Sequence, residues 1–152
     1  MAKSFRYSAP GWGVGELWLE GDLLVHHELP VAGLDEGHPH PLGERLAAYF
    51  GGADVAFDDL ELDLEGWTPF QRAAAAALRA VPRGEVVTYG ELAALAGHPG
   101  AQRAAGSFCA QNRFPIVVPC HRVVAADGLG RYGSLGVDYK RRLLELEGAA
   151  LG

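Results

Sequence analysis

The stretch Phe114–Val124, with the sequence FPIVVPCHRVV, constrains the fold of this chain more than any other. Its centre, Ile116–Val118, is a β-branched apolar run bounded by Pro115 and Pro119. Such a run between two prolines predicts a short, fully buried strand. We expect the chain to turn sharply after the second proline and to present Cys120 just beyond that turn.

Cys120 is followed directly by His121 and Arg122, which give it a basic neighbourhood. Basic neighbours favour the thiolate over the thiol, so this pattern predicts a nucleophilic cysteine. The alternative is structural, because a buried cysteine after an apolar strand is more often a small hydrophobic residue of the core.

The charge is distributed unevenly along the 152 residues, a length that fits one ordinary domain or two small ones. Residues 1–66 carry 3 Lys and Arg against 13 Asp and Glu, a net charge of −10, whereas residues 67–152 carry 10 against 6, a net charge of +4. This asymmetry indicates two modules with different partners, and the basic one could face phosphates. Uneven solubilising charge is the alternative interpretation.

The chain has no apolar run of 18 residues and no signal-peptide pattern at its start, so we expect a cytoplasmic protein that does not enter a membrane. Its two cysteines form neither a disulfide scaffold nor a Cys-x-x-Cys zinc motif. The histidines also make a poor metal site, because His26 and His27 would point to opposite faces of a strand and His38 and His40 lie in a loop rich in proline and glycine.

The first half predicts an α/β domain over residues 1–65, a small antiparallel sheet plus a helix. Residues 14–19 and 23–29 form two expected strands around a Gly-containing turn, and Phe5 and Tyr7 place a third strand before them. A helix is expected over residues 42–50, and the alternating leucines that follow suggest an edge strand or a linker.

The second half predicts a mainly helical domain over residues 66–152. Capping boxes at Thr68–Gln71 and Thr88–Glu91 start helices that should run over residues 69–80 and 89–96. A short strand is expected between them at residues 85–87, and a third helix over residues 101–111. The last two helices together predict a helix-turn-helix, a unit that lays its second helix on DNA. Plain helix packing is the alternative.

The second helix of this pair has an unusual face. Ala104, Ala105, Gly106 and Ser107 give it almost no side chains, and the one large group near its start is Arg103. A face this small lets the helix backbone come close to something narrow.

Several motifs in this order and spacing resemble the O6-alkylguanine-DNA alkyltransferases, also called methylated-DNA–protein-cysteine methyltransferases. They are TPFQ, TYGELAALAG, RAAG, VPCHRVV, RYGS and KRRLLELEG. The resemblance covers about residues 60–148 strongly and the first 60 only in outline.

The resemblance implies a DNA repair protein that flips O6-alkylguanine out of duplex DNA and transfers the alkyl group irreversibly to Cys120 in a single turnover. It implies duplex DNA with this lesion as the partner, and it admits O4-alkylthymine as a second lesion. The expected protein acts as a monomer and uses no cofactor and no metal.

The resemblance also assigns roles to single residues. It makes Cys120 the alkyl acceptor and His121 the neighbour that takes its proton through a water, with Glu147 fixing the histidine. Asn112 holds the active-site turn, and Tyr89 acts on the phosphate beside the target nucleotide and as a proton donor. The DNA-binding set is Tyr89, Arg103, Ala104, Ala105, Gly106 and Arg113, with Arg103 as the finger that fills the vacated space; the substrate pocket is Pro115, Val123, Tyr132, Gly133, Ser134 and Lys140.

Glu147 has an argument of its own from the sequence, because it lies in the last turn of the final helix, where an acid opposes the helix dipole. A residue that breaks a local rule is a functional candidate. Lys140 is expected to contact phosphate or to lie on the surface.

Two departures from the family pattern bear on the site. Arg113 stands where the family usually has proline, so we expect it to reach the DNA backbone. The closing loop has the sequence GLGRYGS and contains Tyr132. The serine that usually follows its tyrosine could correspond to Gly133 or to Ser134.

Two other classes of function stay open. A cysteine hydrolase or transferase that uses Cys120 and His121 would turn over many times. A helix-turn-helix regulator, or an alkylation sensor without transfer chemistry, would bind DNA and transfer nothing.

Overall fold

The structure is a computed structural model that describes residues 1–150, and the chain divides into two compact units. Unit 1 comprises Met1–Asp63 together with the short segment Arg113–Pro115. Unit 2 comprises Leu64–Asn112 and the chain from Ile116 onward. The chain therefore returns to unit 1 for three residues just before it reaches Cys120.

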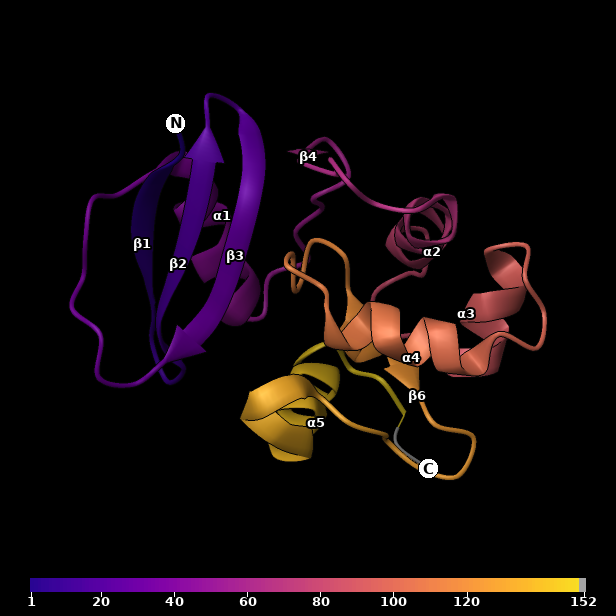
Figure 1. Ribbon diagram of the computed structural model, residues 1–152. Coiled ribbons are helices and arrows are strands. Elements are labelled where there is room, and N and C mark those ends of the chain that lie inside the picture. Colours follow the sequence, from indigo (N-terminus) through magenta and orange to yellow (C-terminus); the bar gives the residue numbers. More distant parts are fainter. Residues whose placement is uncertain (151–152) are drawn as a thin grey trace. The chain divides into compact units, whose positions relative to one another are not determined.

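Unit 1 is built on a small mixed sheet with the strand order β1-β2-β3-β4 (Figure 1). Strand β2 (Gly13–Glu20) pairs antiparallel with both β1 (Lys3–Ala9) and β3 (Leu23–Val31), as the sequence predicts. The two-residue strand β4 (Glu61–Leu62) pairs with β3 in parallel, so the sheet is not purely antiparallel.

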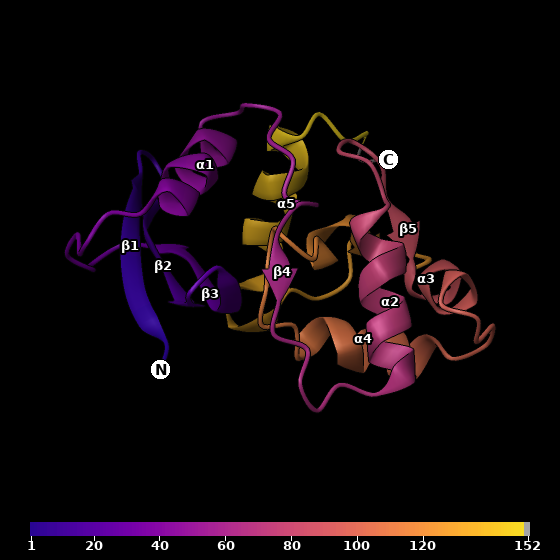
Figure 2. The ribbon, with the colours of Figure 1, turned by 90° about the horizontal axis from the view of Figure 1, so that it is seen from above.

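Helix α1 (Pro41–Phe50) packs on one face of this sheet (Figure 2). The Nδ1 of His40 caps its start by accepting a hydrogen bond from the Leu42 amide at 3.0 Å. The buried side of the helix includes Leu46, which is 1% exposed. Gly43 lets the helix approach β1 closely, because a Cβ at this position would lie 3.0 Å from the Cβ of Tyr7.

Unit 2 is mainly helical, with α2 (Pro69–Arg79), α3 (Tyr89–Leu95), α4 (Gln102–Ala110) and α5 (Gly136–Leu146). Both predicted capping boxes form: the Thr68 hydroxyl accepts from the Gln71 amide and the Thr88 hydroxyl accepts from the Glu91 amide, each at 3.1 Å. Helices α3 and α4 pack against each other on either side of a turn (Figure 1).

Two short strands and two 3-10 turns complete unit 2. Strands β5 (Val87–Thr88) and β6 (Val123–Val124) pair in parallel. The 3-10 turns are η1 (Cys120–Arg122), directly before β6, and η2 (Gly133–Leu135), directly before α5. The pairing of β5 with β6 ties the start of α3 to the chain that leaves Cys120.

The strand predicted at Ile116–Val118 does not form, although all three residues are buried. Ile116 has a φ of +73°, outside the β region, and the Cys120 amide donates to the Val118 carbonyl at 2.8 Å. The flanking prolines have no amide hydrogen to add to a strand ladder. The apolar run is therefore a buried turn, and the nearest strand follows the cysteine.

Within residues 1–150 no helix is both long enough and apolar enough to cross a membrane. The same residues contain no group of three or more His, Cys, Asp and Glu side chains that could hold a metal ion.

Candidate active site

Cys120 begins η1 and is 7% exposed. Asn112, two residues beyond the end of α4, holds the turn that leads to it. The Asn112 Nδ2 donates to the Val118 carbonyl at 2.8 Å and lies 3.3 Å from the Cys120 Sγ. One side chain thus fixes the backbone of the turn and also supplies a hydrogen-bond donor to the sulfur.

His121, the residue directly after Cys120, forms a fully buried pair with Glu147. The His121 Nε2 lies 2.7 Å from the Glu147 Oε2, and both side chains are 0% exposed. A carboxylate can only accept here, so Nε2 carries the hydrogen and Nδ1 is the basic nitrogen of the ring. Burial lowers the pKa of His121, against the raising effect of Glu147, so the ring is neutral at neutral pH and can take up a proton.

Arg122 is a further member of this network that the sequence did not indicate. Its Nε donates to the Glu147 Oε1 at 2.9 Å and its Nη2 donates to Oε2 at 3.0 Å, a two-pronged pairing. Its Nη1 donates to the Val81 carbonyl at 2.7 Å. Glu147, the C-terminal cap of α5, is thereby stabilised as a buried anion.

The structure does not support the predicted basic activation of Cys120 by its two neighbours. Arg122 is paired with Glu147 and His121 is neutral, so neither supplies a positive charge to the sulfur. Burial raises the pKa of the Cys120 thiol, while the Asn112 hydrogen bond and the charge of Lys140 lower it in part, with smaller contributions that include Tyr132. Burial, the largest of these effects, favours the thiol form of Cys120.

Lys140 lies neither on the surface nor where it could touch phosphate, because it is 0% exposed. Its Nζ donates to the Val123 carbonyl at 2.5 Å and to the Arg131 carbonyl at 3.2 Å. The same ammonium lies 5.7 Å from the centroid of the Tyr89 ring. Burial lowers the pKa of Lys140, and the cysteines Cys109 and Cys120 oppose that shift.

Tyr89 begins α3 and is half-buried. Burial raises the pKa of its hydroxyl, and the Arg131 backbone opposes that shift in part. Gly130 makes room for it, since a Cβ there would lie 3.0 Å from the hydroxyl oxygen. The closing loop therefore packs directly on this tyrosine.

The remaining pocket residues fall into a buried and an exposed group. Val123 and Tyr132 are buried, at 0% and 9% exposure. Gly133 and Ser134 are exposed in η2, and Gly133 has a φ of +49°, which suits glycine. Pro115 belongs to unit 1 and is partly buried.

The predicted DNA-facing side of α4 needs one correction. Arg103, Ala104 and Ser107 are exposed, but Ala105 is 0% exposed and faces the core of unit 2. Gly106 is partly exposed, and a Cβ there would meet nothing within 4 Å. The small exposed face therefore consists of Ala104, Gly106 and Ser107, with Arg103 beside it.

The structure does not support the predicted DNA contact of Arg113. Its Nη2 donates to the Asp63 carbonyl at 3.3 Å, and its guanidinium carbon lies 5.6 Å from the centroid of the Phe114 ring. Both contacts engage the guanidinium inside the protein.

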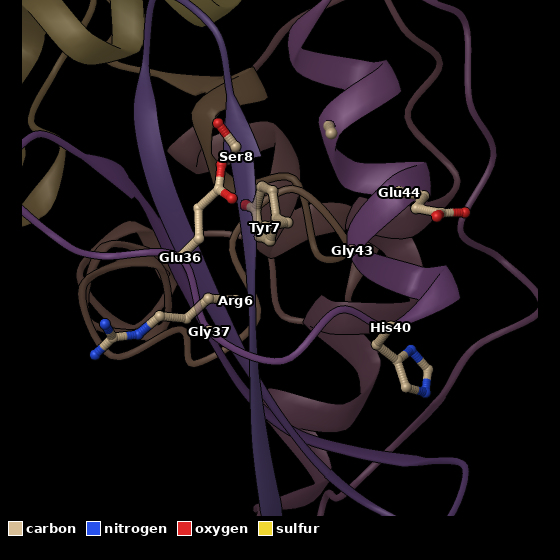
Figure 3. A pocket seen from close by; sticks show the side chains of 9 residues that line it. Arg6, Tyr7, Ser8, Glu36, Gly37, His40, Gly43 and Glu44 are labelled. Carbon is tan, nitrogen blue, oxygen red and sulfur yellow. The ribbon is translucent and has the colours of Figure 1, made fainter.

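Unit 1 contains a separate open pocket of about 210 Å³ between β1, the loop before α1 and α1 itself (Figure 3). Its polar side chains have structural roles: Arg6 donates to the Asp35 carbonyl at 2.9 Å, and His40 caps α1. In Figure 3, Arg6 and Glu44 project in different directions. No cysteine is among the residues that line this pocket.

A buried cysteine held by a donor side chain, followed by a histidine on a buried carboxylate, is an arrangement typical of proteins with a reactive thiol. The comparisons with known proteins identify the kind of reaction. Residues 69–149 match the family model described as 6-O-methylguanine DNA methyltransferase, DNA binding domain. The methylated-DNA–protein-cysteine methyltransferase of Salmonella typhimurium is 46% identical over 150 residues, which cover 98% of this chain and 87% of that protein.

Solved structures agree with these matches. The crystal structure of Mycobacterium tuberculosis O6-methylguanine methyltransferase superposes with a TM-score of 0.82 at 35% identity, covering 97% of this chain and 93% of that one. A crystal structure of the M. tuberculosis protein in complex with DNA gives a TM-score of 0.79 at 38% identity, covering 95% and 92%. The chain belongs to the methylated-DNA–protein-cysteine methyltransferase family, which confirms the resemblance found in the sequence.

Proposed function

We propose that this chain is a DNA repair protein that removes the alkyl group from O6-alkylguanine in duplex DNA and transfers it to the Sγ of its own Cys120. The observation that carries this proposal is the buried Cys120, whose Sγ contacts the Asn112 side chain. The next two residues, His121 and Arg122, both bind the carboxylate of Glu147. The relatives named as methylated-DNA–protein-cysteine methyltransferases support the same chemistry.

The reaction is a displacement at carbon that the chain's own side chains can complete. The Nδ1 of His121 takes the thiol proton through a water, and Glu147 stabilises the imidazolium that results. The S–C bond then forms as the C–O6 bond breaks, and the electron pair of that bond stays on the guanine. Tyr89 supplies the proton that neutralises the departing guanine and regains one from solvent.

The product explains why each chain reacts once. A thioether carries no proton for His121 to remove, and nothing in this mechanism cleaves the new S–C bond. The buried ammonium of Lys140, whose charge lowers the pKa of Cys120, steadies the thiolate while it exists.

Base extrusion is required because O6 lies against the base-pair edge within the stack. In our proposal α3 and α4 are a helix-turn-helix, and the small exposed face of α4 approaches the DNA at Ala104, Gly106 and Ser107. Arg103 then inserts its guanidinium into the space that the nucleotide leaves. The net charge of +4 on residues 67–152 attracts the phosphates.

Finer parts of the proposal follow from the same site. Tyr132, Val123 and the η2 turn would form the walls of the base pocket, and the hydroxyl near the base would come from Ser134. O4-alkylthymine would be a second lesion because it carries the same kind of exocyclic O-alkyl bond. The chain would act as a monomer, with residues 66–152 providing the DNA-binding and acceptor functions and residues 1–65 a structural role.

The decisive experiment is to incubate the protein with methylated duplex DNA and to weigh the intact chain and its peptides. We expect one methyl group per chain, on Cys120 and not on Cys109, whose pKa burial also raises. The Cys120→Ser variant should bind DNA and gain no mass.

Two outcomes would overturn the proposal. Conversion of many lesions by one chain would indicate a cysteine hydrolase or transferase that turns over. Binding that ignores alkylation, with no gain in mass, would indicate a regulator.

A further inference from the structure

His27 holds Arg113–Pro115, the segment of unit 1 that precedes the reactive cysteine along the chain. It lies on β3 and is 1% exposed. Its backbone amide donates to the Arg113 carbonyl at 2.9 Å, and its Nδ1 lies 2.8 Å from the Pro115 carbonyl. One residue of the sheet thus holds the segment Arg113–Pro115 through both its backbone and its side chain.

The contacts of His27 define its tautomer. The Pro115 carbonyl can only accept, so Nδ1 carries the hydrogen and Nε2 accepts from the Tyr7 hydroxyl, 2.7 Å away. Gly15 makes room for that hydroxyl, because a Cβ there would lie 2.2 Å from the Tyr7 ring. Burial lowers the pKa of His27 to about 4, so the ring is neutral at neutral pH, as this arrangement requires.

The held carbonyl adjoins an unusual backbone conformation. Ile116 has a φ of +73°, which is rare for a β-branched residue because its Cβ crowds the backbone. Such a conformation persists only where its surroundings enforce it. Rotation about this φ would swing the peptide plane that contains the Pro115 carbonyl, and His27 opposes that rotation.

The other end of the turn is held independently. The Asn112 Nδ2 binds the Val118 carbonyl and contacts the Cys120 Sγ. Ile116 therefore lies between two fixed carbonyls, and the chain reaches Cys120 only four residues after it.

We propose that His27 is a positioning residue for alkyl transfer: its Nδ1–H holds the Pro115 carbonyl and thereby maintains the Ile116 turn from which the chain runs to Cys120. The inference rests on the proposed function. It gives unit 1 a specific part in the reaction, although His27 itself does not touch the reacting atoms.

The test compares replacements of His27 that can stand in for one ring nitrogen, for the other, or for neither. Asparagine can place an amide N–H where Nδ1–H stands, whereas glutamine places its amide near Nε2 and leucine offers neither. We expect His27→Leu and His27→Gln to slow methyl transfer about five- to tenfold, the loss of one buried hydrogen bond, and His27→Asn to restore most of the rate. Tyr7→Phe should slow methyl transfer less. It removes the hydroxyl that donates to the His27 Nε2 but leaves Nδ1 able to donate to the Pro115 carbonyl.

Hydrogen exchange supplies a readout that is independent of activity. Amides of residues 116–122 should exchange faster in His27→Leu than in Leu46→Ala, a control that weakens the core of unit 1 at α1. Both variants are studied at temperatures where their folded fractions are equal.

The outcomes separate this inference from the proposed function. A wild-type chain that accepts no methyl group would contradict the function, and the exchange experiment would still test the role of His27. If wild type transfers, then equal rates and equal exchange for His27→Leu and Leu46→Ala would overturn the inference. If His27→Leu does not fold, equal methyl-transfer rates for His27→Asn and His27→Gln would overturn the inference.

Discussion

Replacing Gly106 by alanine should stabilise the protein while impairing its action on duplex DNA. Gly106 lies inside α4, and a Cβ there meets nothing within 4 Å, so the fold has no need of a glycine at this position. Glycine in a helix interior costs about 0.5–1 kcal/mol relative to alanine. The variant should therefore gain up to about 1 kcal/mol in the free energy of unfolding, which raises Tm by roughly 2–4 °C for a chain of this size.

The effect on DNA should have the opposite sign. If the small face of α4 approaches the duplex, the added methyl group stands between the helix backbone and the groove and keeps the surfaces apart. A loss of about 1.4 kcal/mol in this contact would slow transfer from duplex about tenfold at subsaturating DNA. The free alkylated base needs no groove contact, so its transfer rate should be unchanged.

The assay times methyl transfer from duplex and from free base, alongside thermal unfolding. Ala110→Gly is the matched control: it changes the stability of α4 in the opposite sense at an exposed position and adds no atoms. It should lower Tm and leave duplex transfer near the wild-type rate. Wild-type transfer from duplex by Gly106→Ala, or equal slowing on both substrates, would show that the helix does not approach DNA at this residue.

Four further predictions test other parts of the site. Arg103→Ala should slow transfer from duplex by roughly ten- to a hundredfold, from a loss of about 1–3 kcal/mol, and leave the free base unaffected; equal slowing of both would exclude a role in the vacated stack. Ala105→Leu should destabilise the whole protein by about 1–3 kcal/mol through overpacking, seen as a lower Tm, and an unchanged Tm would contradict its burial. Glu147→Gln should cost about 3 kcal/mol of stability, because it breaks a buried charged network. It should also slow transfer at least about tenfold from duplex DNA and from the free alkylated guanine alike, because His121 loses the carboxylate that supports it as a proton acceptor. An effect on duplex DNA alone would argue against this role. The free energy of unfolding should fall as pH drops from 6.5 towards 4, because His27 binds a proton in the unfolded chain but not in the folded one, where its pKa is lowered from 6.5 to about 4. The loss is at most about 3 kcal/mol. Denaturation of His27→Asn should show a smaller loss over the same pH range.

Local signals in the sequence predicted the helices well because helix starts depend on nearby residues. Thr68 with Gln71 and Thr88 with Glu91 are complete capping motifs within four residues, and the structure contains both. The three antiparallel strands of unit 1 followed from alternation and turns in the same way. No comparable local signal exists for Arg113–Pro115, whose place in unit 1 depends on His27, more than 80 residues earlier.

The buried turn at Ile116–Val118 shows why the apolar run was misassigned. A buried strand and a buried turn can have the same composition, since both exclude water from β-branched side chains. Here the choice depends on hydrogen bonds to Pro115 and Val118, made by His27 and Asn112. The charge state of Cys120 was missed for a similar reason, because burial and the pairing of Arg122 with Glu147 are long-range properties.

One error could have been avoided with helical periodicity. Ala105 stands three residues before the buried Phe108, so both lie on the core face of α4 and not on its exposed face. The small size of Ala105 suggested a groove contact, but its position in the helix argues for packing. Residue type and helical phase must therefore be considered together.

The same periodicity explains how α5 serves the site. Lys140, Leu143, Leu144 and Glu147 follow the spacing i, i+3, i+4, i+7, which makes a single stripe, and all four residues are buried. A core stripe normally consists of apolar residues alone, so the charges at its two ends are costly unless each has partners. Lys140 binds two backbone carbonyls and lowers the pKa of the Cys120 thiol, while Glu147 binds the base and its arginine neighbour. Because seven residues of helix span about 10 Å, one rigid element supplies both charges at a fixed separation. In the proposed mechanism, one charge serves the thiolate and the other serves the imidazolium that forms as the proton leaves.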